Sequence, residues 1–148
     1  MKIFLTAFGI IGLLFLNGCS LIGEVNDTVE YVDITTEYIN STKTFANEVP
    51  QLAKEAVTDE TARQNLENEL GQMKEQIHSF NEIEPPSIAE DIHNQIVSSN
   101  AKLEEGIDMY LDNIENGTLD PAALENSEIL TTANEISSLM EKINQVLN

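Results

Sequence analysis

The feature that most constrains this fold is a helical repeat of apolar residues, which occurs in four segments separated by helix-stopping residues. Within each segment, apolar residues recur three or four positions apart, so they line one face of an α-helix. The alternation that marks a half-buried strand does not occur in these segments. In the last three segments the repeat consists of Leu66, Leu70, Met73, Ile77 and Phe80, then Ile92, Ile96, Leu103, Ile107, Tyr110 and Ile114, and finally Ile129, Ala133, Ile136, Met140, Ile143 and Leu147.

Two rows of apolar residues spaced by seven predict the first helix over residues 24–48, because such rows lie side by side on one helical face. Pro50 is expected to end or kink this helix, since proline disfavours the helical conformation in the residue before it. The alternative is that apolar residues at positions 52–57 add one or two turns. The two rows are Val25, Val32, Ile39 and Ala46, and Tyr31, Tyr38 and Phe45.

The boundaries between segments carry signals of helix starts and stops. Ser87 and Glu90 have the capping-box spacing, in which each side chain satisfies a free backbone N–H of the other residue. Ser127 is an alternative start for the last helix, after a short turn over residues 121–125. The other signals are Thr58-Asp59 as a helix cap, Asn116-Gly117 as a stop and Asp120-Pro121 as a cap with proline in the first helical position.

Each segment spans about 25 residues, or about 37 Å of helix at 1.5 Å per residue. Helices of similar length, with one apolar face each and short connections, are typical of up-down-up-down bundles. We therefore predict an all-α fold, an antiparallel four-helix bundle formed by residues 24–148. Ser99, Asn100 and Gly106 interrupt the apolar stripe of the third helix. They could line a pocket, mark a close helix contact or fix the register of packing.

The N-terminal residues have the pattern of an export signal followed by a lipid-attachment site. Lys2 gives a positive start, and residues 3–16 form an uncharged, mostly apolar run with the length of a signal-peptide core. That run is short for a membrane-spanning helix, which needs about 20 apolar residues. Leu16-Asn17-Gly18-Cys19 resembles the lipobox of bacterial lipoproteins. We predict a lipoprotein signal peptide at residues 1–18 and a short tether at residues 19–23.

Cys19 is the sole cysteine of the chain, so no disulfide can form within one molecule. After cleavage its thiol is predicted to carry diacylglycerol, whose two acyl chains suffice for stable anchoring where one would be marginal. The alternative is a free thiol at the end of an uncleaved anchor. We expect the protein at the extracellular face of the plasma membrane, with the short tether holding the bundle close to the lipid headgroups.

The predicted mature chain is strongly acidic. Residues 19–148 contain all 26 Asp and Glu together with six Lys and Arg, a net side-chain charge of −20. Such a surface repels nucleic acid, whose binding relies on Lys and Arg at the phosphates, and it also repels anionic lipid headgroups. Basic proteins and divalent cations are the partners that this charge attracts. We therefore predict a protein partner in the envelope and no nucleic-acid partner.

His78 and His93 flank the Pro85-Pro86 turn at nearly symmetric positions, so they could lie level on adjacent antiparallel helices. With a carboxylate such as Glu82 nearby, they could bind zinc or copper. The alternative is two ordinary histidines at the edges of a helix seam. No cofactor is expected.

Residues 112–120 have the sixth-place glycine of a calcium loop, but Ile114 and Ala123 occupy the third and twelfth places, which need oxygen ligands. A helix stop followed by a helix start is the favoured interpretation of this segment. Any divalent-cation binding is then expected to be weak and to involve the acidic surface in general.

The sequence lacks the common catalytic patterns. It has no glycine-rich phosphate loop, no HExxH zinc motif and no recognisable Ser-His-Asp order. Lipid attachment at Cys19 would leave no cysteine nucleophile. We therefore expect a protein that is not an enzyme.

Three segments resemble the small uncharacterised lipoproteins of bacillus-type bacteria, which are grouped as a domain of unknown function. The resemblance implies a lipid-anchored location and a helical fold over essentially the whole chain, and it carries over no catalytic residue. The excess of Lys over Arg agrees with a low-GC Gram-positive source. We expect a membrane-anchored protein-interaction module, with extracellular metal-ion or small-ligand binding as the alternative. The segments are Tyr38-Ile39-Asn40, Phe45-Ala46-Asn47-Glu48 and Gly106-Ile107-Asp108-Met109-Tyr110-Leu111.

Overall fold

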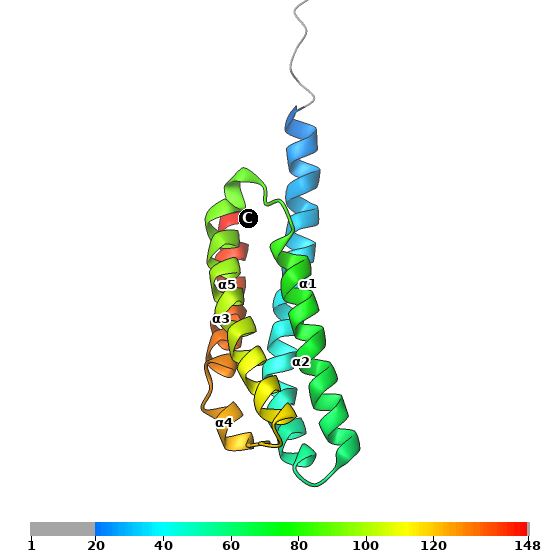
Figure 1. The fold of residues 1–148 in the computed structure, drawn as a ribbon. Coiled ribbons are helices and arrows are strands. Elements are labelled where there is room, and N and C mark those ends of the chain that lie inside the picture. The colour runs from blue at the N-terminus through cyan, green and yellow to red at the C-terminus, as the bar shows by residue number, and fades with distance from the viewer. Residues whose placement is uncertain (1–19, 148) are drawn as a thin grey trace, which may run out of the picture.

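The structure, a computed structural model, describes the backbone of residues 20–147 and the side chains of residues 28–145. Four long helices form a bundle in which each runs opposite to the one before it (Figure 1). No strand occurs in residues 20–147, and the predicted all-α, up-down-up-down architecture is confirmed. The long helices are α1 (Ser20–Ala56), α2 (Glu60–Asn81), α3 (Glu90–Glu115) and α5 (Glu128–Leu147), and the connections contain the 3-10 turn η1 (Ser87–Ala89) and the short helix α4 (Pro121–Glu125).

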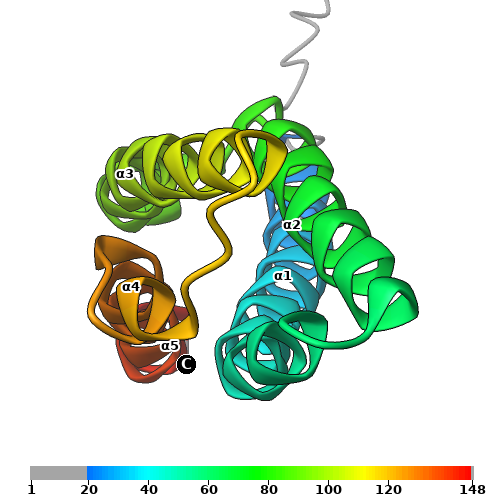
Figure 2. The ribbon, with the colours of Figure 1, turned by 60° about the horizontal axis from the view of Figure 1, so that its bottom comes forward.

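Each long helix packs against two neighbours, so the four helices enclose a single core. α1 contacts α2 and α5, while α3 contacts α5 and α2. An oblique view shows α3 and α5 on one side of the bundle and α1 and α2 on the other (Figure 2). The α2–α3 seam is the least extensive of the four contacts. This seam is also the one that carries most of the polar pairs described below.

The core consists largely of the residues that the apolar repeat predicts. The predicted stripes of α2 and α3 are buried throughout, and in α5 the stripe is buried at Ile129, Ala133, Ile136 and Ile143. Each large apolar side chain removed from water in this way stabilises the fold by about 1.5–3 kcal/mol. In α1 the buried members of the two predicted rows are Tyr31, Tyr38, Ile39, Phe45 and Ala46.

Helix α1 continues past Pro50, where the sequence was expected to end or kink it, and stops at Ala56. Proline costs the helix one backbone hydrogen bond and crowds the preceding turn. Val49, Ala53 and Ala56 are nonetheless almost completely buried on either side of Pro50. Their packing against the core accounts for the extra turns, so the alternative of added turns over positions 52–57 is correct.

Helix α1 also begins earlier than predicted, at Ser20. Residues 20–23 form its first turn, so this part of the segment predicted as a tether (19–23) is helical, and its role as a tether stays a prediction. Cys19 and the predicted signal peptide lie outside the described residues. Tyr31 is the first core residue among the described side chains, and residues 20–30 form about 16 Å of helix before it. Figure 1 shows these turns, in blue, extending past the ends of the neighbouring helices.

Two predicted helix caps are present. The Asp59 carboxylate accepts hydrogen bonds from the backbone N–H groups of Thr61 and Ala62 at the start of α2. Asp120 does the same for Ala122 at the start of α4, with Pro121 in the first turn. Such caps satisfy backbone donors that have no partner within the helix, and each contributes about 1 kcal/mol to stability.

The predicted capping box at the start of α3 is wrong. After Pro86 the chain makes one 3-10 turn, in which the Ala89 N–H donates to the Pro86 carbonyl over 2.8 Å. The helix therefore begins at Glu90, and its cap residue, Ala89, has no side-chain acceptor. The box required Ser87 to be the cap residue, two residues before the observed cap, Ala89.

The predicted stop of α3 and the alternative start of α5 are both confirmed. Gly117 has a φ of +79°, the left-handed conformation that glycine adopts without strain. The N–H of Gly117 donates to Ile114 and that of Thr118 donates to Asn113, so two carbonyls at the helix end are satisfied. α4 covers residues 121–125, and α5 starts directly after Ser127.

Helices α3 and α5 approach each other closely at Gly106. A Cβ atom at this position would lie 2.9 Å from Cγ1 of Ile129, which is closer than side-chain carbons normally approach. Of the alternatives for Gly106, the structure supports a close helix contact.

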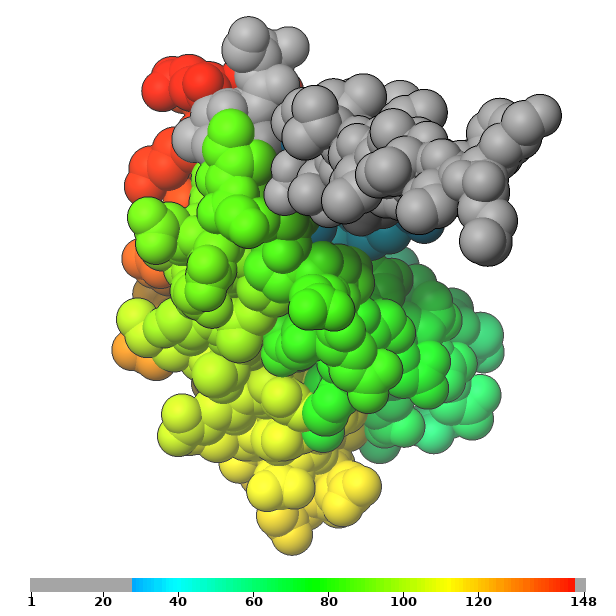
Figure 3. All heavy atoms as spheres, turned by 90° about the horizontal axis from the view of Figure 1, so that it is seen from above, coloured from blue at the N-terminus to red at the C-terminus, as the bar shows by residue number. Residues whose placement is uncertain are grey.

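The α2–α3 connection and the last turns of α5 share one end of the bundle. η1 packs against α5, and the view from above shows the green connection beside the red end of α5 (Figure 3). Ile88, in η1, is 59% exposed there. The first turns of α1 rise from this same end (Figure 1).

Candidate functional site

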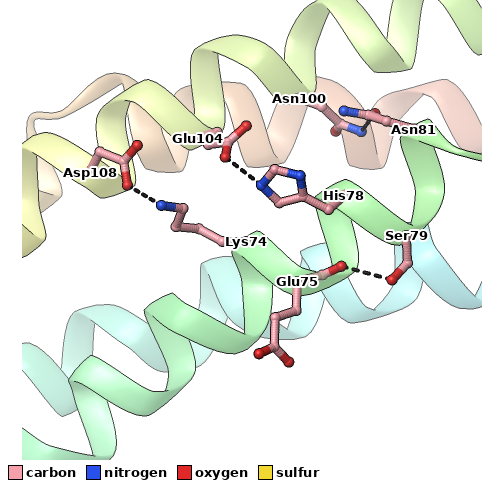
Figure 4. A network of polar contacts seen from close by, with 8 residues as sticks. All are labelled: Lys74, Glu75, His78, Ser79, Asn81, Asn100, Glu104 and Asp108. Carbon is pink, nitrogen blue, oxygen red and sulfur yellow. Dashed lines mark hydrogen bonds and ion pairs between the residues drawn. The ribbon is translucent and has the colours of Figure 1, made fainter.

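His78 lies on the exposed side of the α2–α3 seam. Its Nε2 atom is 2.7 Å from a carboxylate oxygen of Glu104 on α3 (Figure 4). One turn along each helix, Lys74 forms an ion pair with Asp108. This pairing favours the charged form of the lysine and raises the pKa of Lys74 above its usual value.

His93 lies in the interior, in different surroundings. It is 6% exposed, its Nδ1 atom is 3.3 Å from the Tyr31 hydroxyl oxygen, and its ring stacks on Phe80 at a centroid distance of 5.1 Å. Burial lowers the pKa of His93 below its usual value, because desolvation disfavours the imidazolium. Burial in the core therefore favours the neutral form of the His93 ring.

The two histidines do not share a partner in this structure. His78 pairs with Glu104, whereas His93 contacts Tyr31 and Phe80. Among the described residues, no group of three or more His, Cys, Asp and Glu is placed to hold a metal ion. Metal binding by His78 and His93 stays a prediction without structural support.

A buried polar cluster joins three helices. Asn100 on α3 is fully buried, accepts a hydrogen bond from the Tyr38 hydroxyl of α1 and donates one to Asn81 of α2 over 2.8 Å. The Tyr38 ring also stacks on Phe80 at 4.4 Å. Burial raises the pKa of Tyr38 well above its usual value. Because both groups are paired and inaccessible, the cluster sets the register of the helices, as one of the alternatives for Asn100 predicted.

A long groove runs along the outer surface between α1 and α2. It consists of two adjoining hollows, of about 500 and about 620 Å³, which share Glu37, Ser41, Gln72 and Gln76. Buried aromatic and sulfur-containing side chains form its floor, and exposed or half-buried polar side chains form its walls. The floor residues are Tyr38, Phe45, Met73 and Phe80, and the uncharged polar residues are Thr36, Asn40, Ser41, Thr44, Gln72, Gln76 and Ser79.

The groove is negatively charged. Asp33 and Glu37 line it from α1, and Glu69 and Glu75 line it from α2, while no Lys, Arg or His is among its lining residues. None of these four carboxylates has an ion-pair partner among the described residues. Figure 4 shows the Glu75 side chain pointing away from the α2–α3 seam. The groove therefore offers free negative charge beside an apolar floor.

Gln76 adds an unsatisfied acceptor to this groove. Its amide oxygen is buried and has no hydrogen-bond partner within the described part of the chain, although the residue as a whole is half-buried. A buried acceptor without a partner costs about 1–3 kcal/mol. If the Gln76 side chain rotated so that its amide oxygen accepted a hydrogen bond from a ligand, that free energy would be recovered. The chemistry of the groove thus suits a ligand with donors, positive charge and apolar groups.

The groove was not predicted from the sequence, although a signal for it exists. Thr36, Asn40 and Thr44 form a row of uncharged polar residues on α1, and Gln72 and Gln76 form a similar row on α2. Exposed helical faces in so acidic a chain are otherwise rich in Glu and Asp. Two neutral rows on consecutive helices are therefore a recognisable departure from the pattern.

Within residues 20–147, no helix combines the length and the apolar character needed to cross a membrane.

The fold and the groove define an acidic, all-α four-helix bundle with a surface suited to binding. The family model described as "Family of unknown function (DUF6376)" matches residues 31–146, and this chain belongs to that family. The match begins at Tyr31, the first described core residue. This confirms the resemblance to a domain of unknown function.

A curated relative extends the similarity over nearly the whole chain. The "Uncharacterized lipoprotein YybP" of Bacillus subtilis (strain 168) is 35% identical over 146 residues, which cover 99% of each protein. No solved structure matches the chain.

Proposed function

We propose that this chain is a lipoprotein anchored through Cys19 at the outer face of the plasma membrane, where it acts as a non-enzymatic protein-interaction module. The anchor is supported by the lipobox and by a similar protein, over 99% of both lengths, that carries the name lipoprotein. With a net side-chain charge of −20 for residues 19–148, the bundle surface is repelled by anionic headgroups, so the lipid provides the attachment.

The α1–α2 groove is the observation that carries the interaction part of this proposal. It joins a buried apolar floor to hydrogen-bonding walls, which is the usual anatomy of a protein-docking surface. Its lining polar groups are amides, hydroxyls and carboxylates on two rigid helices. This composition fits recognition of another protein better than it fits a chemical step.

The helical start of α1 determines where the partner would meet this surface. Residues 20–30 add about 16 Å of helix between the lipidated residue and Tyr31, the first core residue among the described side chains. The bundle then stands above the headgroups, with the groove running along the helix that rises from the membrane. A membrane protein with an extracellular segment close to the bilayer can reach it.

The test is affinity purification of the tagged lipoprotein from detergent-solubilised membranes, compared with Cys19→Ala. We expect the wild-type protein to be processed, to fractionate with membranes and to recover a protein that the Cys19→Ala variant does not. Recovery of no protein above the Cys19→Ala level would contradict the interaction function. Soluble behaviour of the wild-type protein would contradict the anchor.

A further inference from the structure

We propose that the α1–α2 groove binds a positively charged, amphipathic helix of its protein partner. This inference rests on the proposed function and specifies the chemistry of the partner. Three observations support it: the length of the groove, its unpaired carboxylates, and the helical backbones of its walls, whose polar groups are already hydrogen-bonded.

The dimensions match about three turns of helix. On α1 the groove extends from Asp33 to Phe45, and on α2 it extends from Glu69 to Phe80. At 1.5 Å per residue these stretches are about 18 and about 16 Å long. A helix of about 12 residues spans the same distance.

The backbones of the walls favour a helix over an extended peptide. Both walls are continuous α-helix, so their internal N–H and C=O groups already pair within α1 and α2. An extended segment gains affinity by adding main-chain hydrogen bonds to a free sheet edge, which these walls do not offer. An amphipathic helix satisfies its own backbone and needs only an apolar floor and polar walls.

The floor and the rim specify the two faces of that helix. Phe80 and Tyr38 stack on each other, are at most 6% exposed and form part of the floor, while Ile34, which is 38% exposed, lies at the rim. Leu or similar side chains on one face of the partner would cover this apolar strip. The rim of the groove would then face the other side of the partner helix.

The carboxylates specify positive charge on that second face. Asp33 and Glu37 lie one turn apart on α1, and Glu75 faces the groove from α2, each without an ion-pair partner among the described residues. Lys or Arg side chains placed three or four residues apart on the partner helix can pair with carboxylates on both walls. An acidic helix or an anionic ligand would instead be repelled.

Fluorescence anisotropy with two synthetic peptides tests this inference. The probe is a labelled 14-residue helical peptide with Leu on one face and Lys on the other, and its counterpart carries Glu in place of every Lys. The mature lipoprotein is held in nanodiscs of zwitterionic lipid, so that the membrane itself does not attract the Lys peptide. Glu37→Gln combined with Glu75→Gln removes two charges from the groove.

The matched control is Glu115→Gln combined with Glu141→Gln, which removes two exposed, unpaired charges outside the groove. We expect the Lys peptide to bind about fivefold more weakly to the groove variant and less than twofold more weakly to the control. The Glu peptide should not bind. Ile34→Ser should also weaken the Lys peptide while leaving the net charge unchanged.

Equal weakening by the groove and control variants would overturn the inference, because it would assign binding to the general charge of the surface. Absence of Lys-peptide binding would overturn it as well. If the peptide fails while a membrane protein still cross-links to the groove, the inference about a cationic helix falls and the proposed function stands.

Discussion

The Tyr38 hydroxyl on α1 donates a hydrogen bond to the fully buried amide oxygen of Asn100 on α3, across the diagonal of the bundle. Asn100 also donates to Asn81 of α2, so one side chain links three helices. A buried amide with both sides paired tolerates few alternative registers. Tyr38 and the Phe80 ring on which it stacks both form part of the groove floor. The shape of the groove therefore depends on the register that Asn100 fixes.

Asn100→Ala is expected to lower the free energy of unfolding by about 2–3 kcal/mol, because it leaves the Tyr38 hydroxyl and the Asn81 amide without their partner. Tyr38→Phe should cost about 1 kcal/mol. Asn94→Ala, at an exposed position of the same helix, is the control and should change stability by less than about 0.5 kcal/mol. Urea denaturation followed by circular dichroism measures all three. Equal losses of stability at positions 94 and 100 would show that the buried hydrogen bonds of Asn100 do not contribute to the free energy of unfolding.

Two glycines in helix interiors should respond to alanine in opposite directions. At Gly71 a Cβ meets nothing within 4 Å, so Gly71→Ala should stabilise the protein by about 0.5–1 kcal/mol through helix propensity. At Gly106 the same change places a carbon 2.9 Å from Ile129 on α5. The α3–α5 contact must then open, and we expect a net loss of about 1 kcal/mol. Thermal unfolding compares the variants, and a gain in stability at both sites would refute the close contact.

At pH values below about 6.5 the free energy of unfolding should decrease, and part of this decrease should depend on His93. Burial lowers the folded-state pKa of His93, so the unfolded chain takes up a proton at this site more readily than the folded chain. The contribution is fully present above the unfolded pKa of about 6.5 and is lost as the pH falls through the folded pKa. Its size is about 1.4 kcal/mol for each unit of pKa displacement.

His93→Phe keeps a ring against Phe80 and removes this titration. Urea denaturation at pH 7.5 and 5.5 gives the pH dependence of stability for both proteins. We expect the wild-type protein to lose more stability on acidification than His93→Phe does. An identical pH dependence would mean that His93 accepts a proton in the folded state as easily as in the unfolded chain.

The fold could be predicted from the sequence because the apolar repeats of α2, α3 and α5 are long and regular, and the residues of those stripes are the ones that form the core. Local signals at the helix ends were equally informative where one side chain acts on nearby backbone, as Asp59 and Gly117 do. The apolar periodicity of each helix and these boundaries are both set by residues close together in the chain.

The wrong predictions concern residues whose backbone conformation depends on packing against parts of the chain that are distant in sequence. Pro50 is a helix breaker by itself, but Val49 and Ala53 gain enough burial to carry α1 past it. Ser87 and Glu90 have the spacing of a capping box, yet the turn after Pro86 starts the helix at a different residue. The groove was missed for the same reason, because Glu37 and Glu75 line one hollow only after α1 and α2 have packed.

Site-specific photo-crosslinking in living cells tests the central claim, docking of an envelope protein in the α1–α2 groove, most directly. A photoreactive amino acid replaces Gln72, which is exposed and lines both hollows, or Glu141, which is exposed on α5 outside the groove. We predict a discrete cross-linked product with a membrane protein from position 72 that position 141 does not give. That product should weaken when Glu37→Gln and Glu75→Gln are added. The same products from both positions, or none from position 72, would contradict docking in this groove.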